Sequence, residues 1–508
     1  MYAFVSSLGL MGIEPYVIRV EVDSRKGLPG FDIVGLPDAS VKESRDRVKS
    51  AIQNLGYPFP NAKIVANLAP ADTRKIGSVY DLPILLALIH ASGYENLDFD
   101  GTAVIGEIGL SGELRAVQGV LAMVLDARRM GFKRVVVPQG NAAEAAVAEG
   151  VDIIAAAHAA QIVSYLKGAE SIQPVKAQAL APVIEETWPD LSDVKGQFEA
   201  RRAMEISAAG GHNLLLIGPP GTGKSMLAKR LPSILPEMTD TEAIETTKIY
   251  SVAGLLESGQ ALLRRRPFRA PHHTVSAAAL TGGGPNPKPG DLSLAHNCVL
   301  FLDELPEFNK MALEVLRQPL EDGAVNISRV RQRITYPADV MLVAAMNPCP
   351  CGFYGHPDKK CTCSPAAIQK YLGRVSGPML DRIDIHIEVP PVNYEQMSSR
   401  EKAPASRAAR ERVSAARAVQ HARFAGTAVT CNAGIPPAML GAVCRMDTGA
   451  KALLKASFSA LSLSARAYDR ILKVARTIAD LEGADYIGSA HISEAIQYRS
   501  LDRKYWAG

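Results

Sequence analysis

The 508-residue sequence lacks both a long hydrophobic run and the pattern of an export signal. No apolar stretch reaches the roughly 18 residues that suggest a membrane-spanning helix. A secretory signal places basic side chains ahead of an apolar segment, and residues 1–7 do not show this pattern. Internal repeats and long low-complexity tracts are also missing. A membrane protein and a secreted protein are therefore disfavoured, and a cytoplasmic protein without a membrane partner is expected.

Cysteine is scarce and unevenly placed, because four of the seven cysteines fall within residues 349–363. That distribution is not a disulfide scaffold, so a reducing compartment is expected. Neither sign of charge dominates, since the formal net charge is +4. The first 170 residues carry a small acidic excess, which leaves the positive excess in the rest of the chain. This distribution permits a nucleic-acid partner without requiring one.

The composition, 47% hydrophobic and 21% charged, is typical of a globular protein, and the length suffices for roughly three domains. Residues 1–170 alternate strand-like and helix-like segments and predict an α+β domain. Within them, residues 40–55 have helical spacing, and Ser40 with Glu43 fits a capping box at the start. Residues 171–193 are rich in proline, alanine and acids, and they predict a linker.

Residues 218–225 read Gly-Pro-Pro-Gly-Thr-Gly-Lys-Ser and match the phosphate-binding P-loop pattern. A strand-like run precedes them and a helix-like run follows, which is the context that makes the match specific. Lys224 is expected to reach the β- and γ-phosphates of ATP, and the Ser225 hydroxyl to bind Mg²⁺. The full set expected around the phosphates is Gly218, Pro219, Pro220, Gly221, Thr222, Gly223, Lys224 and Ser225.

Polar residues end two further apolar, strand-like runs. Asp303 and Glu304 follow residues 298–302, and Asn347 follows residues 340–345. In a P-loop ATPase the first carboxylate, Asp303, holds Mg²⁺ directly or through water. Glu304 would polarise the attacking water as general base. Asn347 is expected to orient that water or to sense the γ-phosphate.

Together these residues resemble the AAA+ ATPases, and segments at 269–274, 282–284, 289–290 and 294–297 are similar to the magnesium-chelatase branch. That branch carries an insert in its second helix and a hairpin before the sensor asparagine. The resemblance places the insert at residues 270–292 and the hairpin at 323–337. Hairpins of related ring motors line the central pore, and Arg329, Arg331 and Arg333 near this tip suit a phosphate backbone. A solvated hairpin whose charges prevent aggregation is the alternative.

Three arginines are assigned by the same resemblance. Arg382 resembles the arginine finger, which reaches the ATP of a neighbouring subunit, and Arg374 is a weaker rival. Arg466 resembles the sensor-2 residue, which contacts the γ-phosphate from the C-terminal helical domain. A finger that acts between subunits implies a ring, usually a homo-hexamer. Read alone, each arginine is only a charged residue on a helix or loop.

The cysteine cluster could hold a metal. Cys349, Cys351, Cys361 and Cys363 could complete a tetrahedral structural Zn²⁺ site. The two C-x-C pairs are tighter than the usual C-x₂-C spacing, so four free thiols are the alternative. Cys298, Cys431 and Cys444 are isolated and expected to be packed. Adjacent His272 and His273 have no further ligand at suitable spacing and are expected to be structural.

The N-terminal segments 27–38, 67–72 and 106–115 are similar to the N-terminal domain of the ComM (YifB) family. The second half of this domain also resembles the proteolytic domain of Lon, which uses a Ser–Lys dyad. Ser78 falls near the expected serine, but residues 120–123 carry no lysine where the base should stand. An inactive Lon-like platform is therefore expected.

A basic stretch spans residues 400–423, with seven Lys or Arg against two Glu. It predicts either a helix that faces DNA or a solvated helix that joins the core to its lid.

The expected fold is α/β, with a P-loop AAA+ core whose parallel sheet is flanked by helices. An α+β Lon-like domain at 1–170 and a linker at 171–193 precede the core at 194–392, and a helical lid follows at 393–508. The resemblance implies a homo-hexameric, ATP- and Mg²⁺-dependent DNA helicase or translocase. It would promote branch migration on single-stranded and branched DNA during natural transformation and homologous recombination, alongside recombination proteins.

Two alternatives belong to other classes. A magnesium-chelatase-type motor that remodels a protein partner shares the core, but the Lon-like domain and the cysteines favour the DNA motor. A non-enzymatic scaffold would not need the full hydrolytic set of Glu304, Asn347 and Arg382.

Overall fold

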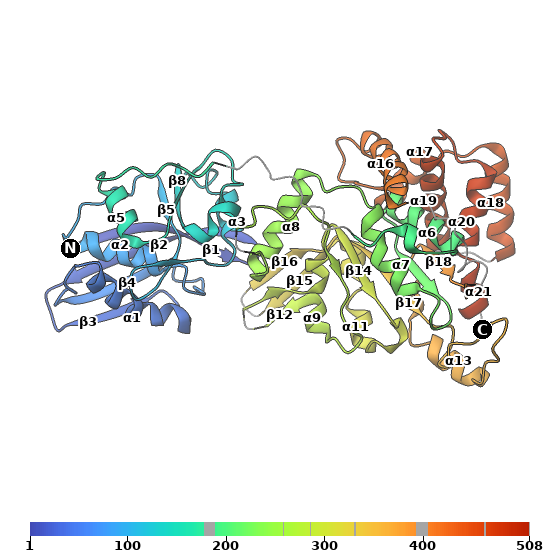
Figure 1. Ribbon diagram of the computed structural model, residues 1–508, viewed down its shortest axis with the longest axis horizontal. Helices are drawn as coiled ribbons and strands as arrows, with labels where there is room; N and C mark the ends of the chain where they lie inside the picture. The colour runs from blue at the N-terminus through green and yellow to red at the C-terminus, as the bar shows by residue number, and fades with distance from the viewer. Residues whose placement is uncertain are drawn as a thin grey trace.

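The computed structural model describes residues 1–176, 188–257, 259–284, 286–329, 332–392, 405–461 and 464–506. Three parts follow one another along the long axis (Figure 1). A domain built on a seven-stranded sheet lies at one end, a core built on a five-stranded sheet lies in the middle, and a group of helices lies at the other end. Within the described ranges, the helices are all too short or too polar to cross a membrane.

The N-terminal sheet has the strand order β3-β4-β2-β1-β5-β8-β9. Its long antiparallel hairpin joins β1 to β2, and β1 then pairs in parallel with β5. Helix α2 is apolar on nearly every side and is buried, as a helix without a polar face must be. The elements are β1 (Tyr2–Met11), β2 (Glu14–Arg25), β3 (Gly30–Val34), α1 (Ala39–Asn54), β4 (Lys63–Ala69), α2 (Asp81–Ala91), β5 (Thr102–Val104), β6 (Glu107–Ile108), β7 (Leu114–Arg115), α3 (Val120–Leu125), β8 (Arg134–Pro138), α4 (Ala142–Ala145), β9 (Asp152–Ala156) and α5 (Ala159–Leu166).

The cap of α1 differs from the sequence expectation. Asp38, rather than Ser40, is the N-cap residue, and its carboxylate accepts the backbone N–H of Val41 at 2.9 Å. An aspartate satisfies the open amides of the first turn as well as serine does, so the earlier of two good caps begins the helix.

The core sheet is entirely parallel, with the order β11-β14-β17-β10-β18. Its central strands are continuous apolar runs, as strands covered on both faces require. The elements are α6 (Phe198–Gly210), β10 (Leu214–Ile217), α7 (Lys224–Arg230), α8 (Asp240–Ala253), β11 (Phe268–Arg269), α9 (Ala277–Thr281), β12 (Gly282–Gly283), β13 (Lys288–Pro289), α10 (Asp291–Leu294), β14 (Cys298–Leu302), α11 (Lys310–Glu314), α12 (Pro319–Asp322), β15 (Ala324–Arg329), β16 (Gln332–Pro337), β17 (Val340–Met346), α13 (Pro365–Leu372), α14 (Gly377–Leu380) and β18 (Ile385–Glu388).

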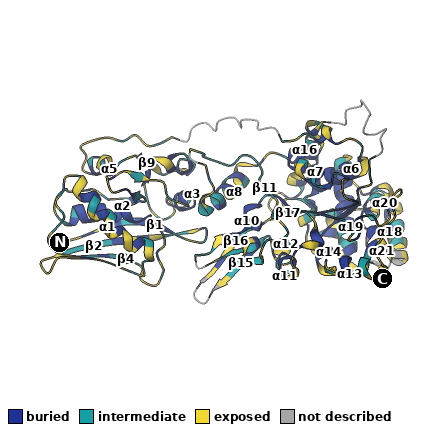
Figure 2. Cartoon of the chain, turned by 60° about the horizontal axis from the view of Figure 1, so that its bottom comes forward, coloured by how far each residue is buried: buried dark blue, intermediate teal, exposed yellow. Residues whose placement is uncertain are grey.

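Two antiparallel ribbons lie in the segments that the sequence assigned to the insert and the hairpin. The short β12–β13 ribbon separates α9 from α10, and β15 pairs with β16 in a second ribbon that projects from the core (Figure 2). Tyr336 of β16 donates its hydroxyl to the carbonyl oxygen of Pro287 at 2.8 Å, which ties the two ribbons together.

The C-terminal helices share a hydrophobic core with the five-stranded sheet. They are α16 (Ser406–Arg423), α17 (Pro437–Val443), α18 (Thr448–Leu461), α19 (Ala465–Leu481), α20 (Ser489–Gln497) and α21 (Leu501–Trp506). The last of them returns to the core, where Leu501 and Tyr505 are buried against Tyr371 and Leu372 of α13.

The basic stretch joins core and lid. Of its described residues, Arg412 pairs with Glu205 of α6 at 2.5 Å, and Arg417 donates to the carbonyl oxygen of Ala208 at 3.1 Å. Arg423 pairs with Asp480 of α19 at 2.6 Å. Arginines engaged in this way favour the joining helix over a helix that faces DNA; Arg400 and Lys402 lie outside the described residues.

Part of the expected linker is packed. Leu191 is buried in the core cluster, and Asp190 accepts the backbone N–H of Ser406 at 3.2 Å. The polar and proline-rich composition that predicted a linker therefore extends into residues that cap the start of α16.

The N-terminal domain contacts the core through α3, α8 and the base of the β15–β16 hairpin. The N–H of Gly119 donates to the carbonyl oxygen of Ser251 at 3.0 Å, and the Ser251 hydroxyl donates to Glu144 at 2.5 Å. Ile13, in the turn between β1 and β2, is buried with Ile334 and Tyr336 of the hairpin. The N-terminal domain thus packs against β16 from its middle to its base.

Candidate ATP site and its neighbouring clusters

The P-loop joins β10 to α7 and requires glycine at defined points. Gly221 and Gly223 have φ of +80° and +87°, a region that side chains with a Cβ rarely adopt. At Gly218 a Cβ would lie 2.3 Å from the carbonyl oxygen of Val389, so the chain there has no space for one. These glycines let the backbone fold tightly at the helix start, where its N–H groups can surround phosphate oxygens.

Lys224 is buried at the centre of the site. Its Nζ donates to the carbonyl oxygens of Gly218 and Pro219 at 2.7 and 2.8 Å, and lies 3.2 Å from Oδ1 of Asn347. Burial lowers the pKa of Lys224 to about 8, against the attraction of Asp303. A desolvated ammonium of this kind gains strongly from an incoming phosphate, which supplies the missing negative charge.

Ser225 and Asp303 provide hard oxygen ligands side by side. The Ser225 hydroxyl donates to Oδ2 of Asp303 at 2.6 Å, and Oδ1 of the same carboxylate accepts the N–H of Glu304 at 2.9 Å. Mg²⁺ prefers oxygen ligands and usually keeps several waters, so a hydroxyl and one carboxylate fit it.

The sheet order explains why these groups meet. β17 lies between β10 and β14, so Asn347 at its end stands between the P-loop and Asp303. Because all three strands are parallel, their carboxyl ends share one edge, where ligands of open α/β sheets bind.

Glu304 has a partner that sequence reasoning missed. Its backbone has φ of +54°, its side chain is 56% exposed, and Oε2 lies 3.1 Å from Nδ1 of His273. His273 follows β11, which pairs with β14, so the loops after these two strands are neighbours. The adjacency of the second and third core strands was the available signal. In the described part of the chain, neither histidine belongs to a candidate metal cluster.

Arg382 lies at the amino ends of the parallel core strands, whereas the P-loop of the same chain lies at their carboxyl ends. It precedes β18, whose first residue pairs with Leu214 at the start of β10, whereas the P-loop follows the last residue of β10. The four residues of β10 span about 13 Å. Its guanidinium donates to the carbonyl oxygens of Arg317 and Pro378 at 2.8 and 2.7 Å and pairs with Glu321.

Arg466 and Arg374 lie in different parts of the structure. Arg466, at the start of α19, lies 3.7 Å from Asp381, the residue before Arg382, and is 63% exposed. Arg374 instead pairs with Glu307 at 2.7 Å, just beyond the acidic end of β14. The structure therefore brings Arg466 together with Arg382, and keeps Arg374 near the Glu304 segment of its own chain.

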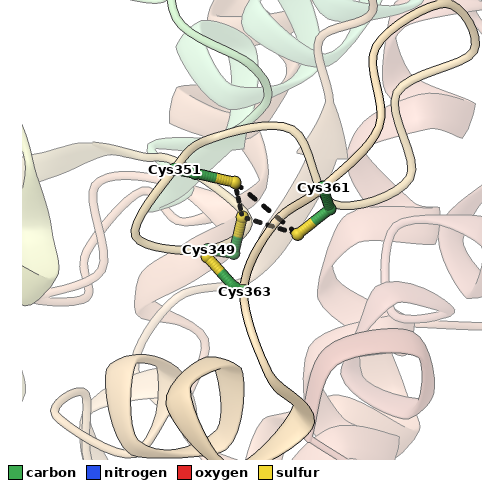
Figure 3. Close-up of side chains that lie close together, drawn as sticks. All are labelled: Cys349, Cys351, Cys361 and Cys363. Atoms are coloured by element: carbon green, nitrogen blue, oxygen red, sulfur yellow. Dashed lines mark hydrogen bonds between the residues drawn. The ribbon is translucent and has the colours of Figure 1, made fainter.

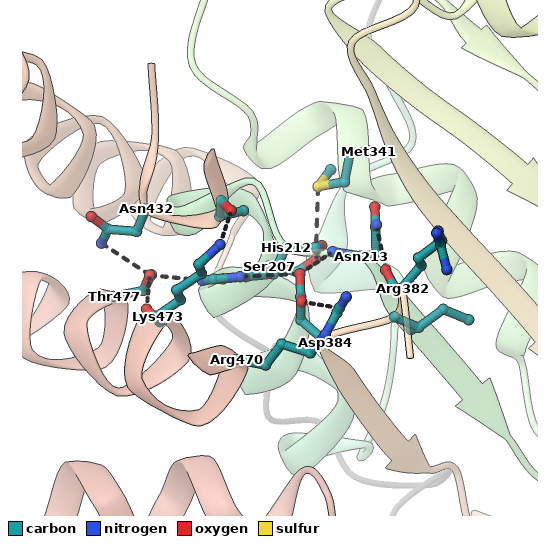
Figure 4. Close-up of polar contacts among 12 residues, drawn as sticks. Ser207, His212, Asn213, Met341, Arg382, Asp384, Asn432, Arg470, Lys473 and Thr477 are labelled. Atoms are coloured by element: carbon teal, nitrogen blue, oxygen red, sulfur yellow. Dashed lines mark hydrogen bonds and ion pairs between the residues drawn. The ribbon is translucent and has the colours of Figure 1, made fainter. Parts of the chain in front are cut away.

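A buried polar network links the segment around Arg382 to α19 among the C-terminal helices (Figure 4). Asp384 accepts from Arg470 at 2.5 Å and lies 3.3 Å from Nδ1 of His212. Burial alone would raise the pKa of Asp384, but the positive charge of Arg470 and the His212 contact hold it below its ordinary value. Asn213 adds a direct link, because its side chain donates to the carbonyl oxygen of Arg382 at 2.7 Å.

The four clustered cysteines converge in the loop after Asn347 (Figure 3). Sγ of Cys349 lies 3.4 Å from that of Cys351 and 3.7 Å from that of Cys361, and all four sulfur atoms lie within 4.8 Å of one another. Backbone N–H groups, first that of Phe353, lower the pKa of Cys351 to about 5. Four convergent sulfur ligands, one already favouring the thiolate, suit a thiophilic metal ion such as Zn²⁺. Among the isolated cysteines, Cys298 and Cys444 are buried and Cys431 is partly exposed.

The hairpin arginines are only partly visible. Arg333 on β16 is exposed, Arg331 lies outside the described residues, and only the backbone of Arg329 is described.

Ser78 lines a cavity of about 390 Å³ together with Met123, which occupies the region where a lysine base would be needed. Its hydroxyl donates to the carboxylate of Glu107. The nearby Lys75 is buried and donates to the carbonyl oxygen of Thr73 at 2.8 Å. An acid beside the serine does not make it a nucleophile as a lysine would.

A P-loop, an acidic pair and a polar residue on the strand between them, all at one edge of a five-stranded parallel sheet, define a P-loop nucleotide-binding protein of the AAA+ class. Family models agree: "Magnesium chelatase, subunit ChlI" matches residues 190–397, "Subunit ChlI of Mg-chelatase" matches 20–141, and "Magnesium chelatase, subunit ChlI C-terminal" matches 403–499.

Full-length relatives narrow the class. The chain is 43% identical to YifB of Escherichia coli over 99% of its own length and 97% of that protein. It is 42% identical to the competence protein ComM of Haemophilus influenzae over 99% and 98% of the two chains. The chain therefore belongs to the ComM/YifB family of magnesium-chelatase-like AAA+ proteins. A shorter match, 27% identical over 171 residues, covers 31% of this chain and 30% of Lon protease 2 of Bacillus subtilis.

Proposed function

We propose that the chain is the subunit of a homo-hexameric DNA motor that hydrolyses ATP and drives branch migration during DNA integration in transformation and recombination. The observation that carries the proposal is the position of Arg382 and Arg466 at the sheet edge opposite their own P-loop. Arginines placed there complete an ATP site only when a neighbouring subunit presents its P-loop. A closed ring of identical subunits satisfies that condition for every site.

Roles at the composite site follow from the geometry. Lys224 and the P-loop amides bind the β- and γ-phosphates, while Ser225 and Asp303 hold Mg²⁺. Glu304 accepts the proton of the attacking water, and Asn347 positions that water. Arg382 and Arg466 of a neighbour stabilise the charge that develops in the transition state. The Lon-like N-terminal domain serves as a platform without proteolytic activity, and the cysteine cluster binds structural Zn²⁺.

The hairpin and the name of one relative support DNA as the substrate of the proposed motor. β15 ends at Arg329 and β16 includes Arg333, Arg331 lies between them in the sequence and outside the described residues, and one relative is named a competence protein. The deciding experiment measures ATP turnover with and without forked DNA, together with strand displacement on a three-stranded junction. DNA-stimulated turnover with displacement by the oligomer supports the motor, and the absence of both overturns it.

A chelatase-type motor is the second candidate, because magnesium-chelatase models match three separate parts of the chain. Such a motor remodels a protein partner, so its ATP turnover would not respond to DNA. The same measurement therefore separates the two functions.

Changing Arg329, Arg331 and Arg333 together to alanine is expected to abolish DNA stimulation of ATP turnover while nucleotide affinity stays unchanged. Each lost phosphate contact on a single strand lowers the slope of log affinity against log salt by about 0.7, so a total change of about 2 is expected. The control is Arg407→Ala, which removes a highly exposed arginine that pairs with Glu411 on α16. Stimulation that survives the triple change would remove the hairpin from the DNA path.

Changing His273 to alanine is expected to raise ATP turnover without DNA by about tenfold. The Nδ1 contact holds the Glu304 carboxylate aside, and a hydrogen bond to a charged group is worth about 1.5 kcal/mol. The control is His272→Ala, which removes a ring that lies 4.1 Å from the His273 ring and contacts Thr274 at 2.9 Å but leaves the His273–Glu304 contact in place. Equal turnover in the two variants would show that the contact does not restrain Glu304.

A further inference from the structure

The loop that carries the four cysteines begins at the sensor residue itself. β17 ends at Met346, Asn347 follows, and Cys349 comes two residues later and is fully buried. Asn347 in turn contacts Lys224 at 3.2 Å. The position of the sensor side chain is therefore fixed on one side by the sheet and on the other by the cysteine loop.

The same loop touches the P-loop. Gly352, between the second and third cysteines, has φ of +83° and packs against Pro220. A Cβ at Gly352 would lie 2.5 Å from Cδ and 3.2 Å from Cγ of that proline. Pro220 belongs to the turn that surrounds the phosphates, so one loop supports both the sensor and the phosphate-binding turn.

The backbone of this loop makes turns, such as the one closed by the N–H of Gly352 and the carbonyl oxygen of Cys349 at 3.0 Å, but no regular element. Residues 349–363 form neither helix nor strand, and the sulfur atoms are the feature on which they converge. Ordering an irregular loop costs conformational entropy, and a metal that joins distant ligands offsets that cost. Four protein thiolates fill a tetrahedral shell completely, so a metal here is structural and has no open position for substrate.

We propose that Cys349, Cys351, Cys361 and Cys363 hold one Zn²⁺ whose role is to fix Pro220 and Asn347, so that loss of the metal weakens ATP binding. Zinc is bound by four thiolates, so zinc binding releases the protons of the thiols to solvent. The inference rests on the proposed function only in taking the P-loop as the ATP site, and it does not depend on DNA.

The first test is metal content against nucleotide affinity. Protein purified without chelator is expected to contain about one zinc per chain by elemental analysis. The double variant Cys361→Ser, Cys363→Ser is expected to lose the zinc and to bind a fluorescent ATP analogue at least about tenfold more weakly. Cys431→Ser, which removes a partly exposed cysteine outside the loop, is the control and is expected to keep both properties.

Misfolding is separated from metal loss by a reversible measurement on the Cys431→Ser protein. Titration with an organic mercurial should release zinc and weaken the analogue's binding, and excess thiol with added ZnCl₂ should restore it. Protein without zinc, or zinc release that leaves affinity unchanged, overturns the inference.

A second variant separates the contact from the metal. Gly352→Ala keeps all four thiolates, so zinc content should stay at the wild-type level while affinity falls at least about tenfold. Gly355→Ala is the matched control, since Gly355 lies in the same loop with φ of +77° but a Cβ there meets nothing within 4 Å. Equal affinities in the two variants overturn the role assigned to the Pro220 contact. All readouts are free of DNA, so failure of the DNA-motor proposal shows separately, as unstimulated turnover.

Discussion

Replacing Glu304 by glutamine is expected to lower ATP turnover by about 10²- to 10⁴-fold, the usual contribution of a general base, while nucleotide affinity changes little. Asp303 is already engaged with Ser225 at 2.6 Å and with a backbone N–H at 2.9 Å. Glu304 is more than half exposed, and its carboxylate at the carboxyl end of β14 contacts His273 at 3.1 Å. Glutamine keeps its size and its capacity to contact His273 but cannot accept a proton from water. Steady-state turnover and binding of a fluorescent ATP analogue provide the two measurements.

Glu307 supplies the matched control. It lies three residues further along, is 43% exposed, and pairs with Arg374 at 2.7 Å. Glu307→Gln removes an equivalent surface charge without touching the proposed base, so turnover should stay within about twofold, as for a typical exposed pair. If the two glutamine variants lose activity equally, Glu304 is not the base.

Local chemistry explains which site features the sequence could predict. The P-loop, Asp303 and Asn347 each follow a continuous apolar run, and parallel strands place such ends along one edge. The cysteines lie close in the chain, so their convergence was also predictable. Each of these motifs consists of residues that are close in sequence, so its spacing alone predicts the local geometry.

The features that the sequence did not predict depend on strand order and helix placement. His273 meets Glu304 because β11 and β14 are adjacent, which no local pattern specifies. Arg466 lies beside Asp381 because α19 packs along the amino-terminal edge of the sheet, where Arg470 and Thr477 also contact the core. Gly352 meets Pro220 only once the loop has folded back over the P-loop. Each contact joins segments whose separation in the chain hides their proximity.

The contacts between the N-terminal domain and the core indicate that this domain supports the β15–β16 hairpin. The β1–β2 turn packs on the base of the hairpin through Ile13, and α3 binds α8 through Gly119 and Ser251. These contacts restrain the hairpin beyond the attachment of its own two strands. The N-terminal domain would thus serve as the support for the element that we propose contacts DNA.

Arg382→Ala and Lys224→Ala are each expected to reduce ATP turnover by about 10³-fold or more, yet a mixture of the two proteins should recover activity. The first variant lacks the finger that stabilises the transition state, and the second lacks the cation that binds the phosphates. When subunits exchange at random in equal amounts, about a quarter of the interfaces join an intact P-loop to an intact Arg382. Turnover of the mixture should therefore approach about a quarter of the wild-type value.

Two controls make the mixing experiment decisive. Pull-down through a tag on one variant establishes that mixed rings have formed, and circular dichroism establishes that Arg382→Ala keeps its fold despite losing contacts to Glu321 and two carbonyl oxygens. Arg374→Ala should retain turnover alone, because Arg374 pairs with Glu307 of its own chain. Arg466→Ala should behave like Arg382→Ala, since the two arginines share one edge of the sheet. Mixed rings without recovered turnover would contradict a site shared between subunits, and with it the structural reason for a ring.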